Sequence, residues 1–196
     1  MQRLDYVRMF QCMHPGFFQR EYIQSIPKDK EYEEMILWLK DFSVDAVKID
    51  VPPEITFEYF RGDADKLLEA VRQVEEGWAP IYEKKPRTFC AYHGDRIVSF
   101  CIIEDMKSYE NLKIGGPGCV GTVPDFRKKG VGLRMVQLAT DILKQEGFDI
   151  SYIHYTGVAR WYAKLGYEPI LKWNGEGILQ VPHDYEEYHS SPKFLG

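Results

Sequence analysis

The segment from Cys119 to Leu133, which reads C-V-G-T-V-P-D-F-R-K-K-G-V-G-L, constrains the fold more than any other part of the chain. Its first five residues are rich in β-branched side chains and stop at Pro124, which predicts a strand. From Val131 onwards, apolar residues recur at helical spacing until Gly147, which predicts a helix. A strand that leads through a short loop into a helix indicates an α/β fold.

The loop inside this segment has the composition of an anion site. The first turn of a helix leaves backbone N–H groups without partners and carries the positive end of the helix dipole. Gly130 and Gly132 leave the backbone bare at this turn, and Arg127, Lys128 and Lys129 add positive charge beside it. The segment therefore predicts a site for a phosphate-bearing cofactor.

Two common phosphate motifs do not fit. The nucleotide P-loop needs Lys and a hydroxyl residue after its last glycine, whereas Leu133 and Arg134 follow Gly132. The dinucleotide pattern needs a third glycine, and Met135 stands there. Ordinary nucleotide binding and a Rossmann site are both disfavoured.

The run R-K-K-G-V-G at 127–132 instead resembles the cofactor loop of the GNAT superfamily of acyl-CoA-dependent N-acetyltransferases, [Q/R]-x-x-G-x-[G/A]. The later run W-Y-A-K-L-G-Y at 161–167 is similar to the helix and turn of that family and places Tyr162 on its usual tyrosine. A weaker match, Gly94 to Phe100, resembles the early hairpin, although Ser99 stands where glycine is common. The resemblance spans about residues 54–171.

The order of predicted elements indicates a mixed α/β sheet, and the resemblance implies a mostly antiparallel central sheet flanked by helices. We expect a GNAT-like domain over 54–196, with a C-terminal strand and tail, and an N-terminal helical extension over 1–53 that packs on the core or a partner. The extension contains a predicted helix, Asp29–Leu39, and ends at Pro52-Pro53. The other predicted elements are strands at 55–60, 88–92, 97–103, 148–155, 170–173 and 177–181 and helices at 64–76, with Asp63 as N-cap, and 158–165.

The resemblance implies a function as an N-acetyltransferase that moves an acetyl group from acetyl-CoA to a primary amine by direct attack in a ternary complex. The resemblance places the acetyl carbonyl and the pantetheine arm of the cofactor along the strand that begins at Cys119. It places the diphosphate at the loop after this strand and at the start of the following helix. The implied cofactor-binding residues are Val120, Gly121, Thr122, Arg127, Lys128, Lys129, Gly130, Val131, Gly132 and Leu133. For Gly121, a bulge or tight packing within the strand is the alternative interpretation, and the two lysines are alternatively solvated loop charges.

Tyr162 is the predicted general acid. A phenol with an ordinary pKa of ~10 stays protonated at neutral pH and can protonate a departing thiolate whose thiol has a pKa of about 8.5. The alternative is an aromatic core residue on a short helix. The matching Leu165-Gly166-Tyr167 favours the catalytic interpretation.

The general base is less well defined. The two family positions for glutamate hold Gly116 and Ile150, neither of which can accept a proton. His154, near the end of a predicted strand, has a suitable ordinary pKa of ~6.5, and Glu104 and Asp105 end the predicted hairpin. A structural role for His154 and a chain of water molecules as the base are the alternatives. The family asparagine seven residues before Tyr162 is Tyr155 here, which puts that cofactor contact in doubt.

Composition excludes several classes of protein. A net charge of -5 disfavours a nucleic-acid surface, because phosphate backbones need a broad basic face. Apolar runs are short and the first residues lack an apolar signal core, so we expect a cytoplasmic protein without membrane spans. The 4 cysteines and 5 histidines lack ligand spacing, so we predict no metal.

The acceptor is expected to be a small-molecule or peptide amine. The extension carries Phe17, Phe18, Tyr22, Tyr32 and Trp38, which would serve an acceptor pocket, a homodimer contact or ordinary packing. A noncatalytic acyl-CoA-binding regulatory domain, with the cofactor loop but no working base, is the alternative function.

Overall fold

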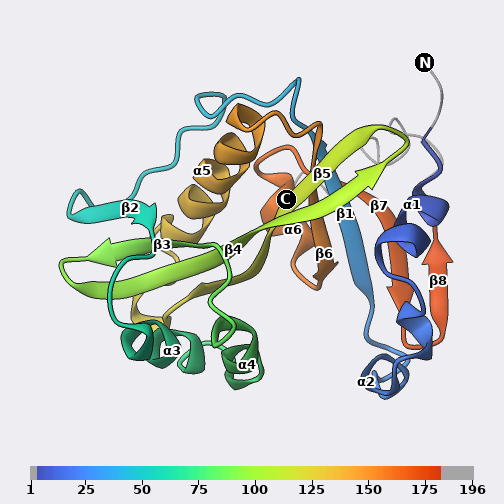
Figure 1. Cartoon of the computed structure of the whole chain (residues 1–196), viewed down its shortest axis with the longest axis horizontal. Coiled ribbons are helices and arrows are strands. Elements are labelled where there is room, and N and C mark those ends of the chain that lie inside the picture. Colours follow the sequence, from blue (N-terminus) through green and yellow to red (C-terminus); the bar gives the residue numbers. More distant parts are fainter. Residues whose placement is uncertain (1–3, 182–196) are drawn as a thin grey trace.

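One eight-stranded sheet runs through the chain in a computed structural model that describes residues 4–181 (Figure 1). The strands lie in the order β2-β3-β4-β5-β6-β1-β7-β8. Strands β5 and β6 pair in parallel, and the other neighbouring pairs are antiparallel. The strands are β1 (Tyr32–Trp38), β2 (Ile55–Tyr59), β3 (Thr88–His93), β4 (Arg96–Tyr109), β5 (Leu112–Thr122), β6 (Ile150–Thr156), β7 (Glu168–Asn174) and β8 (Gly177–Gln180).

Helices cover both faces of this sheet. Helices α1 and α3 pack on one face, and α5 and α6 pack on the other. The helices and short 3-10 turns are α1 (Tyr6–Met13), η1 (Phe17–Gln19), α2 (Glu21–Gln24), α3 (Ala64–Arg72), η2 (Glu76–Trp78), α4 (Ala79–Tyr82), η3 (Pro124–Phe126), α5 (Val131–Gln145) and α6 (Ala159–Ala163). None of the helices in residues 4–181 is both long and apolar enough to cross a membrane.

The helix predicted at Asp29–Leu39 is wrong, because this segment forms strand β1 in the interior of the sheet. β1 lies between β6 and β7 and pairs with both. Met35 packs on the α6 face and Ile36 on the α1 face, so consecutive side chains are buried on opposite sides. A strand covered on both faces reads as a continuous apolar run, which periodicity cannot distinguish from a helix. The extension thus supplies a sheet strand, while the predicted boundary near residue 53 stays a prediction.

Most other predicted elements are present, with altered ends. Asp63 caps α3, since its side chain accepts a hydrogen bond from the Asp65 backbone N–H. Strands β4 and β5 are much longer than predicted and form a hairpin that turns at Glu110 and Asn111, both with positive φ. The run G-G-P-G at 115–118 lies inside β5. The predicted C-terminal tail falls outside the described residues.

Candidate active site

Strands β5 and β6 diverge after a short stretch of pairing. Their parallel ladder consists of Ile114 with Ile150 and Gly115 with Ser151. At Gly116 a Cβ atom would lie 1.9 Å from the carbonyl oxygen of Tyr152, so the strands meet too closely for any side chain there. Beyond this point β5 and β6 no longer pair with each other, so the edge of β5 that faces β6 is open. A bulge around Cys119, where φ is 46°, bends β5 at the opening.

A pocket of about 640 Å³ adjoins this opening on the α5 face of the sheet. It collects most of the residues that the sequence assigned to the cofactor, from the end of β5, the loop and the first turn of α5. It is lined by Val120, Thr122, Phe126, Arg127, Lys128, Gly130, Val131, Gly132, Leu133, Val158, Trp161, Tyr162 and Lys164. Of the predicted site, Gly121, Lys129 and His154 are not part of this lining.

The loop glycines are required by close approaches. Gly130 is the N-cap of α5 with φ 76°, and a Cβ there would lie 2.3 Å from the backbone oxygen of Asp50. At Gly132 a Cβ would lie 2.5 Å from Thr122 Oγ1. No side chain caps α5, so the N–H groups of its first turn remain available to a ligand. Arg127 is held beside them, because its Nε donates to the Thr122 carbonyl over 3.0 Å.

Gly121 and Lys129 are the two predicted cofactor-binding residues outside the lining of the pocket. A Cβ on Gly121 would lie 2.3 Å from the Phe100 ring, so its missing side chain makes room for a buried aromatic residue on the other side of β5. The Lys129 ammonium lies 4.7 Å from the centre of the Phe126 ring. Tight packing therefore accounts for the bare Cα of Gly121, and backbone contact with the cofactor stays a prediction.

Tyr162 lies in the wall of the pocket on α6. Its ring is buried and makes edge contacts with Trp161 and Tyr167. Burial raises its pKa well above the ordinary value, with Tyr167 and two thiols adding to the shift, so the phenol stays protonated. The Tyr167 hydroxyl lies 2.8 Å from Thr140 Oγ1 and 2.6 Å from Ser151 Oγ, which ties the turn after α6 to α5 and β6.

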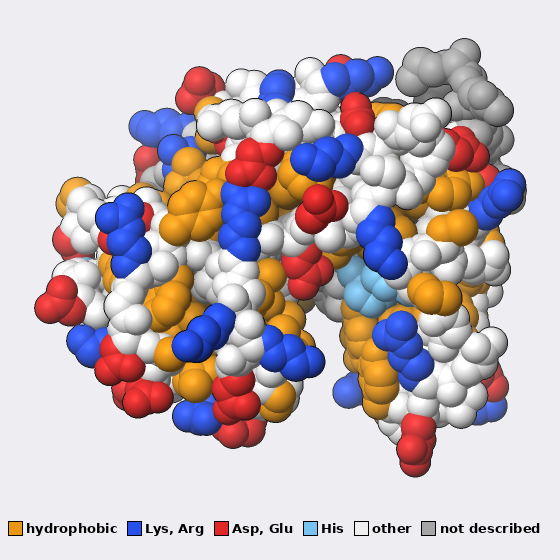
Figure 2. Space-filling model, viewed as in Figure 1, with side chains coloured by type: hydrophobic (Ala, Val, Ile, Leu, Met, Phe, Trp, Pro, Cys, Tyr) orange, Lys and Arg blue, Asp and Glu red, His pale blue; other side chains and the backbone are white. Residues whose placement is uncertain are grey.

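His154 lies on the opposite face of the sheet from Tyr162. Its neighbour Ile153 packs with Tyr162 in the α6 cluster, whereas the His154 ring stacks on His14, the residue that ends α1. The two predicted catalytic residues thus flank the opened strands from different sides. Figure 2 shows a histidine side chain in the wall of a hollow between the N-terminal helices and the α3–α4 side of the molecule.

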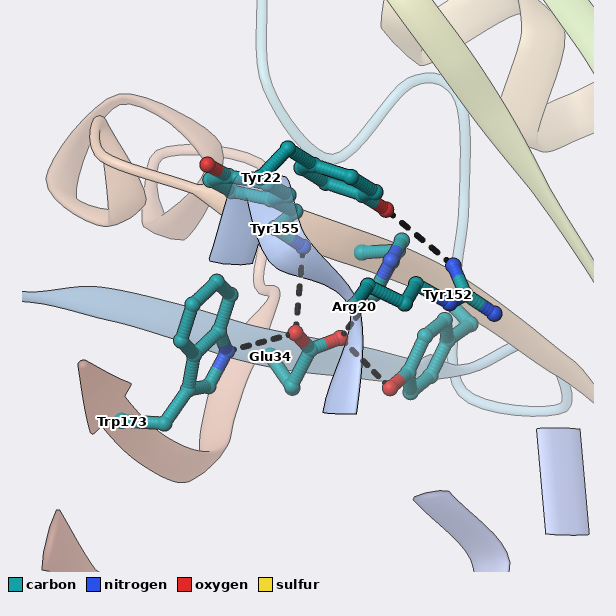
Figure 3. Close-up of polar contacts among 7 residues, drawn as sticks. Arg20, Tyr22, Glu34, Tyr152, Tyr155 and Trp173 are labelled. Carbon is teal, nitrogen blue, oxygen red and sulfur yellow. Dashed lines mark hydrogen bonds and ion pairs between the residues drawn. The ribbon is translucent and has the colours of Figure 1, made fainter. Parts of the chain in front are cut away.

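His154 is held by a carboxylate that sequence reasoning missed. Glu34 on β1 is fully buried, and its Oε2 lies 2.9 Å from His154 Nδ1. The same oxygen accepts from the Tyr152 hydroxyl over 2.6 Å, while Oε1 accepts from Trp173 Nε1 over 2.7 Å and from the Tyr155 backbone N–H over 3.2 Å (Figure 3). Its only signal in the sequence was a carboxylate within an apolar run.

Glu104 lies beside the opening on β4. Its Oε1 lies 3.3 Å from the position that a Cβ on Gly118 would occupy. Burial raises the pKa of Glu104, and the opposing charge effect of His154 reduces this shift. Burial, with a contribution from Glu104, also raises the pKa of the Cys119 thiol to about 12. Glu104 therefore lies within electrostatic range of both the β5 bulge and His154.

The same region contains a cluster of possible metal ligands. Donor atoms of His14, Glu34 and His154 lie within 4.8 Å of one another. The imidazole rings of the two histidines are stacked with an angle of 11° between their planes. Their nitrogen lone pairs lie within these two nearly parallel planes, whose ring centres are 3.7 Å apart, so the two rings cannot both direct a lone pair at one ion. The absence of a metal stays a prediction.

The comparisons with known proteins agree with this geometry. Residues 84–169 match the sequence family described as the acetyltransferase (GNAT) domain. This stretch is less than half of the chain, and it resembles a GNAT acetyltransferase domain. The resemblance found in the sequence and the predicted mixed, mostly antiparallel fold are confirmed. No curated protein sequence matches the chain.

Several solved structures share the GNAT fold at low sequence identity. The GCN5-related glucosamine N-acetyltransferase region of a fungal multi-domain GH3 β-N-acetylglucosaminidase superposes with a TM-score of 0.63 and 19% identity, over 88% of this chain and 23% of that one. A GCN5-related N-acetyltransferase from Sphaerobacter thermophilus gives 0.59 and 18%, over 86% and 54%. One from Kribbella flavida gives 0.53 and 16%, over 89% and 66%. The chain thus spans about a quarter to two thirds of these proteins.

Proposed function

We propose that this GNAT domain transfers the acetyl group of acetyl-CoA to a primary amine of a small-molecule or peptide acceptor, by direct attack in a ternary complex. The observation that carries the proposal is the pocket at the start of α5, which opens onto the unpaired edge of β5. One end of the pocket suits a diphosphate. A thioester bound at the other end would lie at the opening between β5 and β6, which can be reached from both faces of the sheet.

The residues present fit coenzyme A. The uncapped first turn of α5 offers N–H groups to a diphosphate, and Arg127 and Lys128 add positive charge at the same end of the pocket. Side chains on Gly130 or Gly132 would occupy this cradle or displace its walls. The open edge of β5 can pair with the amide groups of a pantetheine arm, as an added strand would. When bound, acetyl-CoA would supply the acetyl group as an activated thioester.

The protein groups then divide the chemistry between the two faces. Backbone N–H groups of β5 near Val120 would stabilise the negative charge that develops on the carbonyl oxygen. Glu104 attracts the acceptor as an ammonium, which first gives one proton to solvent to become the free amine. On one face His154 then takes the proton that the amine nitrogen loses as the N–C bond forms. On the other face Tyr162 gives its proton to the sulfur as the C–S bond breaks. Both protons are accounted for.

Direct attack is favoured over transfer through an enzyme cysteine. Cys119 is the thiol nearest the opening, and its pKa of about 12 keeps it protonated near neutral pH. A thiol is a poor nucleophile, because the thiolate is the reactive form. The acetyl group is therefore expected to pass to the amine in one transfer.

Two measurements test the proposal. Calorimetry should detect coenzyme A binding that is weakened by Arg127→Ala and abolished by Gly130→Val, and thiol release from acetyl-CoA should depend on an added amine. Coenzyme A binding without turnover on a broad panel of amines would favour the noncatalytic regulatory alternative. No binding at all would overturn both. The cytoplasmic location and a homodimer stay predictions.

A further inference from the structure

The buried carboxylate of Glu34 lies outside the GNAT match at 84–169 and belongs to the inserted strand β1. Its position depends on irregular pairing, because the register of β1 shifts at this point against both β6 and β7. On β6 the same irregularity gives Tyr155 a φ of 56°. The Tyr155 N–H, which would otherwise belong to the strand ladder, donates to Glu34 instead.

The partners of Glu34 fix the direction of its bond to His154. The indole of Trp173 and the backbone N–H of Tyr155 can only donate. Burial raises the pKa of Tyr152 well above its ordinary value, and the negative charge of Glu34 adds to this shift. The Tyr152 hydroxyl therefore keeps its proton and also donates. With three donors satisfied, an ionised Glu34 accepts its fourth hydrogen bond from His154 Nδ1. In the neutral imidazole this leaves Nε2 as the nitrogen with a free lone pair.

The other side of the His154 ring is held by His14. The ring centroids are 3.7 Å apart and Phe17 makes an edge contact at 5.1 Å, so the imidazole cannot rotate without disturbing α1 and η1. The pKa of His14 falls to about 3, through burial and the positive charges of His154 and Arg20. His14 therefore stays neutral and does not compete for Glu34. The side chain of His154 remains 22% exposed.

We propose that Glu34 is a positioning residue for the acetyltransferase, which holds the Nδ1–H of His154 on its carboxylate and leaves Nε2 to accept the proton of the acceptor amine. The proposal rests on the proposed function. It makes the acceptor side of the site depend on the N-terminal strand β1. An imidazolium formed on His154 would be stabilised at once by a carboxylate that needs no reorganisation.

Other polar and charged groups near His154 do not replace Glu34 as its partner. Arg20 on the N-terminal side donates to the hydroxyl of Tyr22. Glu104 on β4 acts on His154 through space. Tyr155 has its pKa raised to about 12 by burial, with Tyr32 adding to the shift, and it remains neutral. Among the described residues, Glu34 is the carboxylate in direct contact with the ring.

The test combines kinetics with nuclear magnetic resonance on the full chain. In Glu34→Gln, kcat/KM for the amine should fall about 100-fold and its acid limb should move to lower pH, because the imidazolium loses its counter-charge, while the affinity for coenzyme A is unchanged. Glu33→Gln, which removes a carboxylate from the neighbouring position of β1, should leave the profile unaltered. An unshifted profile in Glu34→Gln would overturn the proposal.

A second measurement needs neither turnover nor a variant. Long-range nitrogen–proton correlations of histidine side chains should show His154 with its proton on Nδ1 in the neutral form. A proton on Nε2 would overturn the proposal even if acetyl transfer is confirmed. Bound zinc in stoichiometric amount, with loss of this correlation pattern on its removal, would equally overturn it in favour of a metal centre. If no amine is acetylated but the Nδ1 proton is seen, the proposed function fails and the Glu34–His154 geometry stands.

Discussion

The rings of His14 and His154 lie face to face, with centroids 3.7 Å apart and an angle of 11° between their planes. Two stacked imidazoles cannot both carry a proton at low cost, and burial makes His14 the one that stays neutral. Its pKa falls from 6.5 to about 3 in the folded protein. Between these values the unfolded chain binds the additional proton, so the free energy of unfolding falls as pH decreases below 6.5.

Replacing His14 by phenylalanine should remove this pH dependence. The aromatic ring keeps its contacts with Phe10 and His154 but cannot titrate. Denaturant unfolding of His14→Phe between pH 4 and 7.5 should show uptake of about one proton fewer than in the unchanged protein. If the free energy of unfolding changed with pH equally in the two proteins, the pH dependence could not be assigned to His14.

Replacing Tyr162 by phenylalanine should impair chemistry and leave the fold intact. The buried ring keeps its contacts with Trp161 and Tyr167, while the proton donor is lost. We expect kcat to fall about 100-fold with little change in KM for acetyl-CoA. The matched control is Tyr167→Phe, which breaks the bridge to Thr140 and Ser151 and should cost roughly 1 kcal/mol of stability with kcat nearly preserved. Equal kcat in Tyr162→Phe and the unchanged protein would remove Tyr162 from the mechanism.

Substitutions of Gly132, in the cofactor loop, and of Gly121, in β5, should have different effects. In Gly132→Val the added side chain meets Thr122 and Trp161 at the pocket wall, so KM for acetyl-CoA should rise about tenfold or more. In Gly121→Ala the methyl group meets the buried Phe100 ring, and the loss should be of stability, about 1–3 kcal/mol. Steady-state kinetics and thermal unfolding of both variants separate the effects. A selective loss of acetyl-CoA affinity in Gly121→Ala would return this residue to the binding site.

The cofactor side of the site could be predicted because it is written in contiguous sequence. The loop at 127–132 and the turn at 161–167 each carry their geometry locally, through glycine placement and helix spacing. Val120, Gly132 and Tyr162 line one pocket, and their part in binding the cofactor stays a prediction. The fold class followed from the same segments, because a strand, loop and helix in this order leave few alternatives.

The contacts of His154 could not be predicted, because they join distant parts of the chain. Glu34 meets its partners on β6 and β7 across more than a hundred residues. That pairing depends on β1 entering the sheet, and a doubly buried strand gives no periodic signal. His14 likewise gave no sign of the ring on which it stacks. The wrongly predicted helix thus concealed Glu34, whereas His14 lies outside that segment.

Glu104 gives a last prediction in which stability and function change in opposite directions. Burial raises its pKa, so the folded protein holds a proton more tightly than the unfolded chain does, and ionisation at higher pH destabilises the fold. Glu104→Gln should therefore raise the melting temperature near pH 7, and this advantage should disappear as pH falls below the ordinary carboxyl value of 4.5.

The same substitution should weaken recognition of the acceptor. Removing the carboxylate beside the β5 bulge should raise KM for the amine about tenfold and leave KM for acetyl-CoA unaltered, because the cofactor pocket lies on the other face. Asp105→Asn, one residue away and exposed, is the matched control and should change neither quantity. A melting temperature that falls in Glu104→Gln would show that the carboxylate has a stabilising partner. If the carboxylate of Glu104 destabilises the fold and still improves binding of a cationic acceptor, its role is functional rather than structural.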